Sequence, residues 1–370
     1  MAWFIGLMSG TSLDGVDAVL AEVRPGQPAL QSRGHAHRAF PETLRAELLA
    51  LNLSGFDELH RSALAANTLV RVYAELVHEL LADAGLPSTA VRAVGAHGQT
   101  VRHRPGAFDG TGYTLQLMNG ALLAELCGID VVCDFRSRDL AAGGQGAPLV
   151  PAFHAACFGA PGRHRAVLNL GGIANLTLLA ADGSVLGFDT GPANVLMDGW
   201  CRRHHGRNFD DDGTWAAGGR VDASLLQRWL AEPYFERAPP KSTGRDLFDM
   251  DWLAAHLGTE AHEAADVMAT LAELSARTVT DALLRHAPAT DELFVAGGGA
   301  FNGHLLGRLQ ALLPGVQVQT SAALGVPADQ MEALAFAWLA QACLERQPGN
   351  LPAVTGARGP RVLGAVYPAA

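Results

Sequence analysis

Short apolar runs alternate with amphipathic stretches along the chain, and glycine-rich turns follow several of the apolar runs. An apolar run at 3–8, a polar turn and an alternating stretch at 16–23 together predict a β-hairpin. Apolar residues at helical spacing over 44–53 and 59–84 predict two helices, and Gly85 ends the second. Because strands and helices alternate in this way, the pattern predicts an α/β fold.

The same pattern continues to the C-terminus. Further strands are predicted at 91–96, 113–117, 129–133, 166–170, 174–180, 185–188, 292–295 and 316–320. Further helices are predicted after Asn119, between the glycine-rich loop 143–148 and Cys157, from Pro192 through Cys201, over 223–230 and 261–286, after Asn302, and from Pro327 to about Leu344. Asparagine is a common helix cap, and proline suits the first turn of a helix.

A strand, a glycine turn and a second strand open both halves of the chain, although the two halves show no sequence repeat. We therefore expect two α/β domains at 1–163 and 164–345, which suits a length of 370 residues. The Pro/Gly-rich segment 346–370 is expected to pack back on the first domain. Open α/β sheets bind ligands at the carboxyl ends of their strands, so two such domains facing each other predict a nucleotide cleft.

The composition of the chain disfavours several kinds of protein, partner and site. A content of 49% hydrophobic and 17% charged residues excludes intrinsic disorder. A formal net charge of −10 disfavours nucleic acid and anionic membranes as partners. The five cysteines lack CxxC spacing, which disfavours disulfides and structural zinc. No signal peptide and no membrane-spanning apolar run is recognised, so we expect a cytoplasmic protein.

Neither of the common single-motif nucleotide folds explains the glycines. The tripeptide Lys241-Ser242-Thr243 lacks the glycine frame of a Walker A motif and follows two prolines, which indicates a loop. Counting from Gly297, Asn302 stands where the Rossmann pattern needs its last glycine. Nucleotide binding therefore has to be sought at three separate glycine turns.

Two of these turns have the features of a nucleotide site. At Gly10–Asp17, small residues allow phosphate to approach the backbone, and Thr11 and Ser12 offer hydroxyl groups. An ordinary hairpin turn explains this segment equally well. At Gly297–Gly299, a flat glycine surface suits a planar ring such as adenine. The alternative is tight packing between a strand and a helix, although three consecutive glycines exceed what packing needs.

The remaining turn contains a carboxylate. Asp189 follows the strand at 185–188, within Gly187–Pro192. In a cleft this side chain could orient water, bind a metal or act as a general base. Taken alone, the commoner role of an Asp at this spacing is to cap the helix that follows Pro192.

Two other polar residues are candidates for a sugar site. Gln99 and Arg138 could bind hydroxyl groups or a carboxylate, since arginine pairs with carboxylates through two hydrogen bonds. Solvated surface loops are the alternative for both residues. Glu332 lies in the apolar final helix, where a charged residue is expected at the solvent edge.

These turns, in this order, resemble those of the superfamily of acetate and sugar kinases, heat-shock ATPases and actin. A closer resemblance, to the anhydro-N-acetylmuramic acid kinase family, covers nearly the whole chain. The segments that carry it are 6–17, 95–100, 134–136, 144–151, 169–175 and 187–192. It implies two ribonuclease-H-like or actin-like α/β domains, and a homodimer. The family uses ATP and Mg²⁺ to phosphorylate 1,6-anhydro-N-acetylmuramic acid while water opens the anhydro bridge, in bacterial cell-wall recycling.

The resemblance also implies site residues. Asp189 becomes the candidate base for the attacking water. The candidates for ATP binding are Gly10, Thr11, Ser12, Leu13, Asp14, Gly15, Val16, Asp17, Asn169, Gly171, Gly172, Gly191, Gly297, Gly298, Gly299 and Asn302. The candidates for the sugar are Gln99, Arg138, Gln145, Pro148, Asn175 and Glu332.

One position departs from the superfamily. Met8 stands where many members carry an aspartate before the first turn, which leaves the direct ligands of Mg²⁺ unassigned; phosphates and water can hold the ion instead. Two rival functions remain, a kinase of another amino sugar and an actin-like or heat-shock-like ATPase. The ATPase would not need the clusters at 97–100 and 144–151, and it would usually carry extra subdomains.

Overall fold

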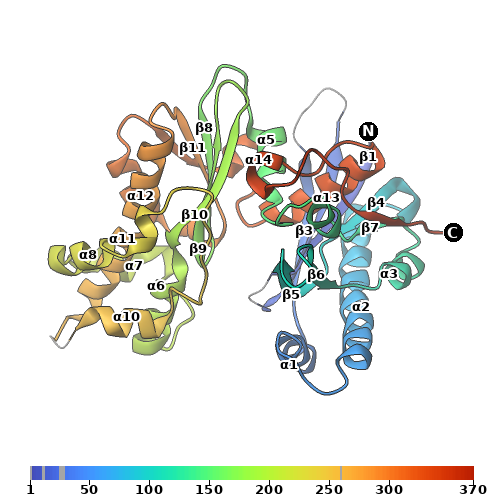
Figure 1. Cartoon of the computed structure of the whole chain (residues 1–370), viewed down its shortest axis with the longest axis horizontal. Helices are drawn as coiled ribbons and strands as arrows, with labels where there is room; N and C mark the ends of the chain where they lie inside the picture. The colour runs from blue at the N-terminus through green and yellow to red at the C-terminus, as the bar shows by residue number, and fades with distance from the viewer. Residues whose placement is uncertain (1, 11–12, 25–29, 259–260) are drawn as a thin grey trace. The chain divides into compact units, whose positions relative to one another are not determined.

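The computed structural model describes residues 2–10, 13–24, 30–258 and 261–370 (Figure 1). It consists of two compact units. Unit 1 comprises Met1–Cys157 together with Gln330–Ala370, and unit 2 comprises Phe158–Asp329. No helix in these described ranges is both long and apolar enough to cross a membrane.

Unit 1 is built on a mixed six-stranded sheet with the order β13-β7-β4-β1-β2-β3. Strands β1 (Ala2–Met8), β2 (Gly15–Val23) and β3 (Gln31–Ala39) are antiparallel neighbours, which confirms the predicted hairpin. Strand β4 (Val91–Ala96) runs parallel to β1, and β7 (Val131–Cys133) runs parallel to β4. At the edge, β13 (Ala365–Tyr367) pairs with β7. A separate hairpin joins β5 (Gln99–Pro105) to β6 (Gly112–Leu117).

Helices cover both faces of this sheet. Ile5 and Leu7 of β1 belong to the apolar cluster that also holds the buried residues of α1 (Glu42–Ala50), α2 (Glu58–Ala84) and α3 (Gly120–Cys127). Side chains alternate along a strand, so Gly6 faces the other way, towards α13 (Met331–Leu344). The other helices of this part of the chain are α4 (Ser137–Ala141), α5 (Val150–Phe158) and α14 (Pro352–Thr355).

The close approach of α13 explains why the final helix belongs to unit 1. A Cβ atom on Gly6 would lie 1.8 Å from the carbonyl oxygen of Ala333, and one on Gly95 would lie 2.0 Å from that of Phe336. The helix backbone therefore rests directly on β1 and β4. The predicted division placed 330–345 in the second domain, and the structure corrects it. The helix also begins at Met331 rather than at Pro327.

Unit 2 contains a five-stranded sheet with the order β10-β9-β8-β11-β12. Its strands are β8 (Arg165–Leu170), β9 (Ile173–Leu179), β10 (Val185–Pro192), β11 (Glu292–Ala296) and β12 (Gln317–Thr320). The helices are α6 (Asn194–His205), α7 (Thr214–Gly218), α8 (Ala223–Leu230), α9 (Pro233–Glu236), α10 (Met250–Leu257), α11 (Ala264–His286) and α12 (Gly303–Leu312). The long helix α11 is buried along most of its length in the core of this unit.

Both sheets share one topology. In each, three antiparallel strands that are consecutive in sequence are followed by strands parallel to the first of them, which gives the order 3-2-1-4-5. This is the arrangement of ribonuclease-H-like domains, and it confirms the predicted α/β class. Strands β3 and β5 were not predicted from the sequence.

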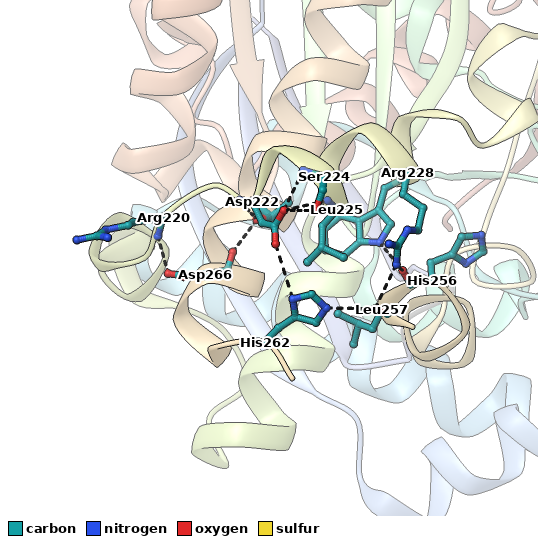
Figure 2. A network of polar contacts seen from close by, with 11 residues as sticks. Arg220, Asp222, Ser224, Leu225, Arg228, His256, Leu257, His262 and Asp266 are labelled. Atoms are coloured by element: carbon teal, nitrogen blue, oxygen red, sulfur yellow. Dashed lines mark hydrogen bonds and ion pairs between the residues drawn. The ribbon is translucent and has the colours of Figure 1, made fainter. Parts of the chain in front are cut away.

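A polar network joins the helices of unit 2 at α8, α10 and α11 (Figure 2). Asp222 caps α8, where it accepts a hydrogen bond from the Ser224 amide at 2.9 Å. Its own amide donates to the Thr270 hydroxyl of α11 at 2.9 Å. Arg228 of α8 donates to the Leu257 carbonyl at the end of α10. The network therefore satisfies polar groups at helix ends that would otherwise lack partners.

Candidate functional site

The turn between β1 and β2 shows which predicted ATP-binding residues can reach a ligand. Thr11 and Ser12 lie outside the described residues. Leu13, with a φ of 58°, and Val16 turn their side chains into the apolar core, where they are 5% and 0% exposed. These two side chains anchor the turn to the sheet, so only the backbone of Leu13 and Val16 is left for a contact with ATP, and their assignment to ATP stays a prediction.

Packing also explains two more residues of this turn. A Cβ atom on Gly15 would lie 2.4 Å from the Arg38 carbonyl oxygen, so strand β3 requires glycine there. The Asp17 carboxylate lies 3.1 Å from a ring nitrogen of His35 and 3.1 Å from one of His37. Of the described residues predicted here, Asp14 is exposed, and Gly10 and Asp17 are partly exposed.

A buried histidine lies directly beneath the turn. The His97 ring contacts the Ser9 carbonyl through Nδ1 at 3.2 Å and the Arg136 guanidinium through Nε2 at 2.9 and 3.1 Å. A carbonyl only accepts and a guanidinium only donates, so Nδ1 carries the hydrogen and Nε2 accepts. Burial, followed by the charge of Arg136, lowers the pKa of His97 to about 3. The ring is therefore neutral and is a fixed part of the scaffold.

Arg136 joins this histidine to the loop that follows α4. Its third guanidinium nitrogen, Nη1, donates to the Gly146 carbonyl at 2.8 Å. Burial lowers the pKa of Arg136 to about 10, and the negative charge of Glu332 opposes that shift. The Glu332 side chain is exposed, as predicted. Desolvation by the surrounding protein raises the pKa of Glu332, and the charges of Asp17 and Asp14 raise it further. The charge of Arg136 opposes this rise in the pKa. Acidic and basic groups therefore influence one another across this face of unit 1.

Asp139 shows that the segment 134–139 is not simply a solvated loop, which was the alternative considered from the sequence. This carboxylate is fully buried and accepts hydrogen bonds from the Gly146 amide at 2.7 Å, from Asn350 at 2.6 Å and from Thr355 at 2.8 Å. The Gln145 amide donates to the Thr355 carbonyl at 2.7 Å. The loop 144–148 is thus tied to the C-terminal segment through Asp139.

The predicted sugar-binding residues of unit 1 differ in accessibility. Arg138, Gln145 and Pro148 are exposed. Gln99 is fully buried and donates through Nε2 to the Gly10 carbonyl at 3.0 Å, whereas its Oε1 atom has no hydrogen-bond partner within the described ranges. Gln99 therefore supports the turn between β1 and β2, and its assignment to the sugar stays a prediction.

In unit 2, three polar residues form a row across the sheet. Asn169 of β8 lies opposite Asn175 of β9, and Asn175 lies opposite Asp189 of β10. Residues opposite each other in a sheet share a face, so the three side chains project together from the end of the sheet where β8 and β10 finish. All three are partly exposed. Leu168 and Leu176 point to the opposite, helix-covered face.

Asp189 is a strand residue and not a helix cap. Strand β10 continues through Pro192, so Pro192 does not begin a helix, and α6 starts at Asn194 with no side-chain cap. Instead, the Asp189 Oδ2 atom accepts a hydrogen bond from the Thr243 amide at 3.0 Å. The capping alternative is therefore wrong, and the carboxylate is held at a sheet end.

Residues that the sequence did not single out surround this carboxylate. The Tyr234 hydroxyl donates to the Asp189 carbonyl at 2.9 Å, and the Asp189 amide donates to the Lys241 carbonyl at 3.1 Å. Burial raises the pKa of Asp189, while the Thr243 amide and the charge of Lys241 oppose the shift. The only available sequence signal was the polar tripeptide that begins at Lys241.

The glycines of unit 2 fall into two groups. Packing requires Gly297, with a φ of 80° and a Cβ position 2.4 Å from Asn169 Oδ1, and Gly299, 2.6 Å from the Leu170 side chain. Gly191 is likewise buried against Phe235. By contrast, a Cβ atom on Gly298 would meet nothing within 4 Å. Gly171 and Gly172 also leave space, with nearest contacts of 3.6 and 3.7 Å.

Asn302 has a structural role, as its predicted cap position requires. Its Oδ1 atom accepts a hydrogen bond from the Leu305 amide at 2.9 Å, and the residue is only 9% exposed. This contact does not support its assignment to ATP.

The described ranges contain no group of three or more His, Cys, Asp and Glu side chains that could hold a metal ion. Mg²⁺ commonly keeps several waters and binds substrate phosphates with few protein ligands. An ion held in that way needs no cage of protein ligands.

Comparison with known proteins decides the family. The model of the family described as anhydro-N-acetylmuramic acid kinase matches residues 2–369. The chain is 60% identical over 372 residues to the anhydro-N-acetylmuramic acid kinase of Variovorax paradoxus, covering 99% of each sequence. It is 62% identical to that of Bordetella petrii, covering 99% of this chain and 96% of the relative. The chain belongs to the anhydro-N-acetylmuramic acid kinase family.

Membership of this kinase family over the whole chain removes the actin-like and heat-shock-like ATPases as rivals. Among solved structures, the chain is similar to the activator of the 2-hydroxyisocaproyl-CoA dehydratase from Clostridium difficile with bound ADPNP. That similarity has a TM-score of 0.44 at 13% identity and covers 90% of this chain and 92% of that one.

Gly298 allows a direct test of the nucleotide turn in this kinase. A valine at Gly298 fills open space and leaves the fold intact, but it should obstruct a nucleotide lying on the turn. We expect ATP affinity, measured by calorimetry, to fall at least about tenfold, or about 1.4 kcal/mol. Gly307→Val is the matched control, because Gly307 also faces open space, within α12. Equal ATP affinities in the two folded variants would remove Gly298 from the site.

Proposed function

We propose that this chain uses ATP and water to convert 1,6-anhydro-N-acetylmuramic acid into N-acetylmuramic acid 6-phosphate, a step of bacterial cell-wall recycling in the cytoplasm. Family membership supports the substrate and the phosphoryl donor. The observation that carries the mechanism is the Asp189 carboxylate. One of its oxygens is held by the Thr243 amide, and the other has no protein partner in the described part of the chain.

Asp189 is the general base of this mechanism. The carboxylate accepts a proton from a water molecule as the water oxygen bonds to the anomeric carbon. The bond between the anomeric carbon and O6 breaks, and its electron pair goes to O6. O6 then bonds to the γ-phosphorus of ATP, the bond from that phosphorus to the bridging oxygen breaks, and ADP leaves. Asp189 finally releases its proton to solvent.

The other residues bind and orient the reactants. Gly10–Ser12 and Gly171–Gly172 are the turns that we assign to phosphate, and Gly298 is the glycine that we assign to adenosine. Catalysis of phosphoryl transfer consists largely of such positioning and charge stabilisation. When bound, Mg²⁺ neutralises phosphate charge, and we assign it to the ATP phosphates and water rather than to a protein cage.

The sugar is assigned to the accessible polar residues. Arg138 is exposed and can pair with the carboxylate of the muramoyl group. Gln145 and Pro148 lie on the loop that Asp139 fixes, which supports a preformed surface. Asn175 lies in the same row as Asp189, and Glu332 lies at the start of α13.

The base is tested by Asp189→Asn. The amide oxygen can still accept the Thr243 hydrogen bond, but the side chain cannot take the proton. We expect kcat to fall about 10²–10⁴-fold, with little change in the affinity for ATP. Asp182→Asn is the control, since Asp182 lies at the exposed turn between β9 and β10 of the same sheet. A fully active Asp189→Asn enzyme would exclude the mechanism.

We further propose that the protein acts as a homodimer, as the family resemblance implies. Four large apolar side chains at the turn from α1 to α2 support a contact there: Leu49, Leu53, Phe56 and Leu59 are 61–91% exposed. Large exposed apolar patches commonly mark protein interfaces. Sedimentation equilibrium should give twice the chain mass of 38.8 kDa, and a Phe56→Ser, Leu59→Ser double variant should give the chain mass. A monomeric parent protein would contradict the dimer.

A further inference from the structure

The segment Tyr234–Thr243 holds Asp189 at three points. The Tyr234 hydroxyl donates to the Asp189 carbonyl, the Lys241 carbonyl accepts the Asp189 amide, and the Thr243 amide donates to Oδ2. Two of the three contacts come from residues only two positions apart in one loop. The orientation of the carboxylate therefore depends on how firmly that loop is held.

Lys241 fixes the loop through its side chain. Its ammonium group donates to the carbonyls of Tyr234 at 3.3 Å and Phe235 at 3.2 Å, both in α9. It also lies 4.7 Å from the centre of the Tyr234 ring, within range of a cation–π interaction. One side chain thus ties the loop that binds the Asp189 carboxylate to the helix whose tyrosine binds the Asp189 carbonyl.

Charged groups and a cavity surround the Lys241 side chain. It lines a cavity of about 200 Å³ together with Thr190, Glu236, Asp281, Arg285 and His286. Burial, Arg285 and Arg237 lower the pKa of Lys241, whereas Glu236 and Asp189 oppose the shift. The cavity leaves room for a substituted side chain at position 241.

We infer that Lys241 is a positioning residue for Asp189: it fixes the loop that binds the carboxylate and supplies a positive charge that favours the ionised base. The inference rests on the proposed role of Asp189. It concerns a residue that need not contact ATP or sugar. Lys241 acts through the backbone of its loop and through its charge.

The positive charge of Lys241 shifts the pKa of Asp189 in a definite direction. Burial raises the pKa of Asp189, and Lys241 and the Thr243 amide lower it. Tyr234, the other titratable group in contact, has a pKa raised by burial and by Asp189, so it stays neutral at physiological pH. Removing the charge of Lys241 therefore raises the pKa of Asp189 further. A general base must be deprotonated, so activity on the acid side should disappear at a higher pH.

The experiment is a set of pH profiles of kcat for the full-length parent enzyme and for Lys241→Met, Lys241→Arg and Tyr234→Phe. Lys241→Met removes the charge and both carbonyl contacts. We expect its acid-side midpoint to rise by a few tenths to about one pH unit, with kcat at neutral pH reduced about tenfold. Lys241→Arg keeps the charge and the donors and should restore the parent midpoint. Tyr234→Phe removes a neutral contact and should leave the midpoint unchanged, whatever its effect on kcat.

Asp189→Asn, measured in parallel, distinguishes a failure of the role of Lys241 from a failure of the role of Asp189 as the base. If Asp189→Asn is inactive and the Lys241→Met midpoint equals that of the parent, the role of Lys241 is wrong and the proposed function stands. If Asp189→Asn is active, the proposed base is wrong and the inference fails with it. If Lys241→Met does not fold, as judged by thermal melting, Lys241→Gln takes its place, and a parent-like midpoint in that variant also overturns the inference.

Discussion

A carboxylate that is partly buried within a β-sheet is costly to ionise, and the arrangement of unit 2 around Asp189 reduces that cost. Burial alone would keep the group protonated at a higher pH. A backbone amide from Thr243 and the nearby charge of Lys241 act against this. The sheet fixes the backbone of Asp189, and the loop at 241–243 fixes its side chain. The carboxylate is therefore oriented in the free protein, and such orientation lowers the reorganisation that the proposed general base would need.

Unit 1 also contains buried polar groups, and hydrogen bonds from neighbouring segments hold them in place. His97 is buried and neutral, and its protonated nitrogen is determined by a carbonyl on one side and a guanidinium on the other. Asp139 is buried with three hydrogen-bond donors around it. These polar groups connect β1, the loop 144–148 and the C-terminal segment. Because a half-satisfied buried network is destabilising, such a network favours one arrangement of those segments.

The sequence predicted the elements whose signals are local. The helix α2 has strong apolar periodicity and ends at Gly85, and Asn119 and Asn302 cap helices as predicted. Strand β3 was missed because its polar residues lack a clear apolar face. The end of β10 and the assignment of α13 depend on contacts between segments far apart in sequence. Such contacts leave no local pattern.

The candidate site was predicted in a similar, partial way. Asp189 was selected from the sequence because a carboxylate that follows a predicted strand can act as a base. Only the fold excluded its alternative role as a helix cap. Motif resemblance did not indicate that Leu13, Gly15 and Gly299 also serve packing, and their assignment to ATP stays a prediction. It also missed Thr243, whose amide reaches Asp189 across 54 positions in the sequence.

The central claim is that water activated by Asp189 opens the anhydro bridge, so that O6 of the sugar receives the phosphoryl group. Turnover in heavy-oxygen water, followed by mass spectrometry of the product fragments, tests this directly. The account predicts heavy oxygen in the anomeric hydroxyl and none in the phosphate ester bridge. A parallel incubation of unlabelled product in heavy water corrects for exchange at the anomeric carbon. Heavy oxygen in the ester bridge, or an anomeric hydroxyl labelled no faster than by exchange, would contradict the account.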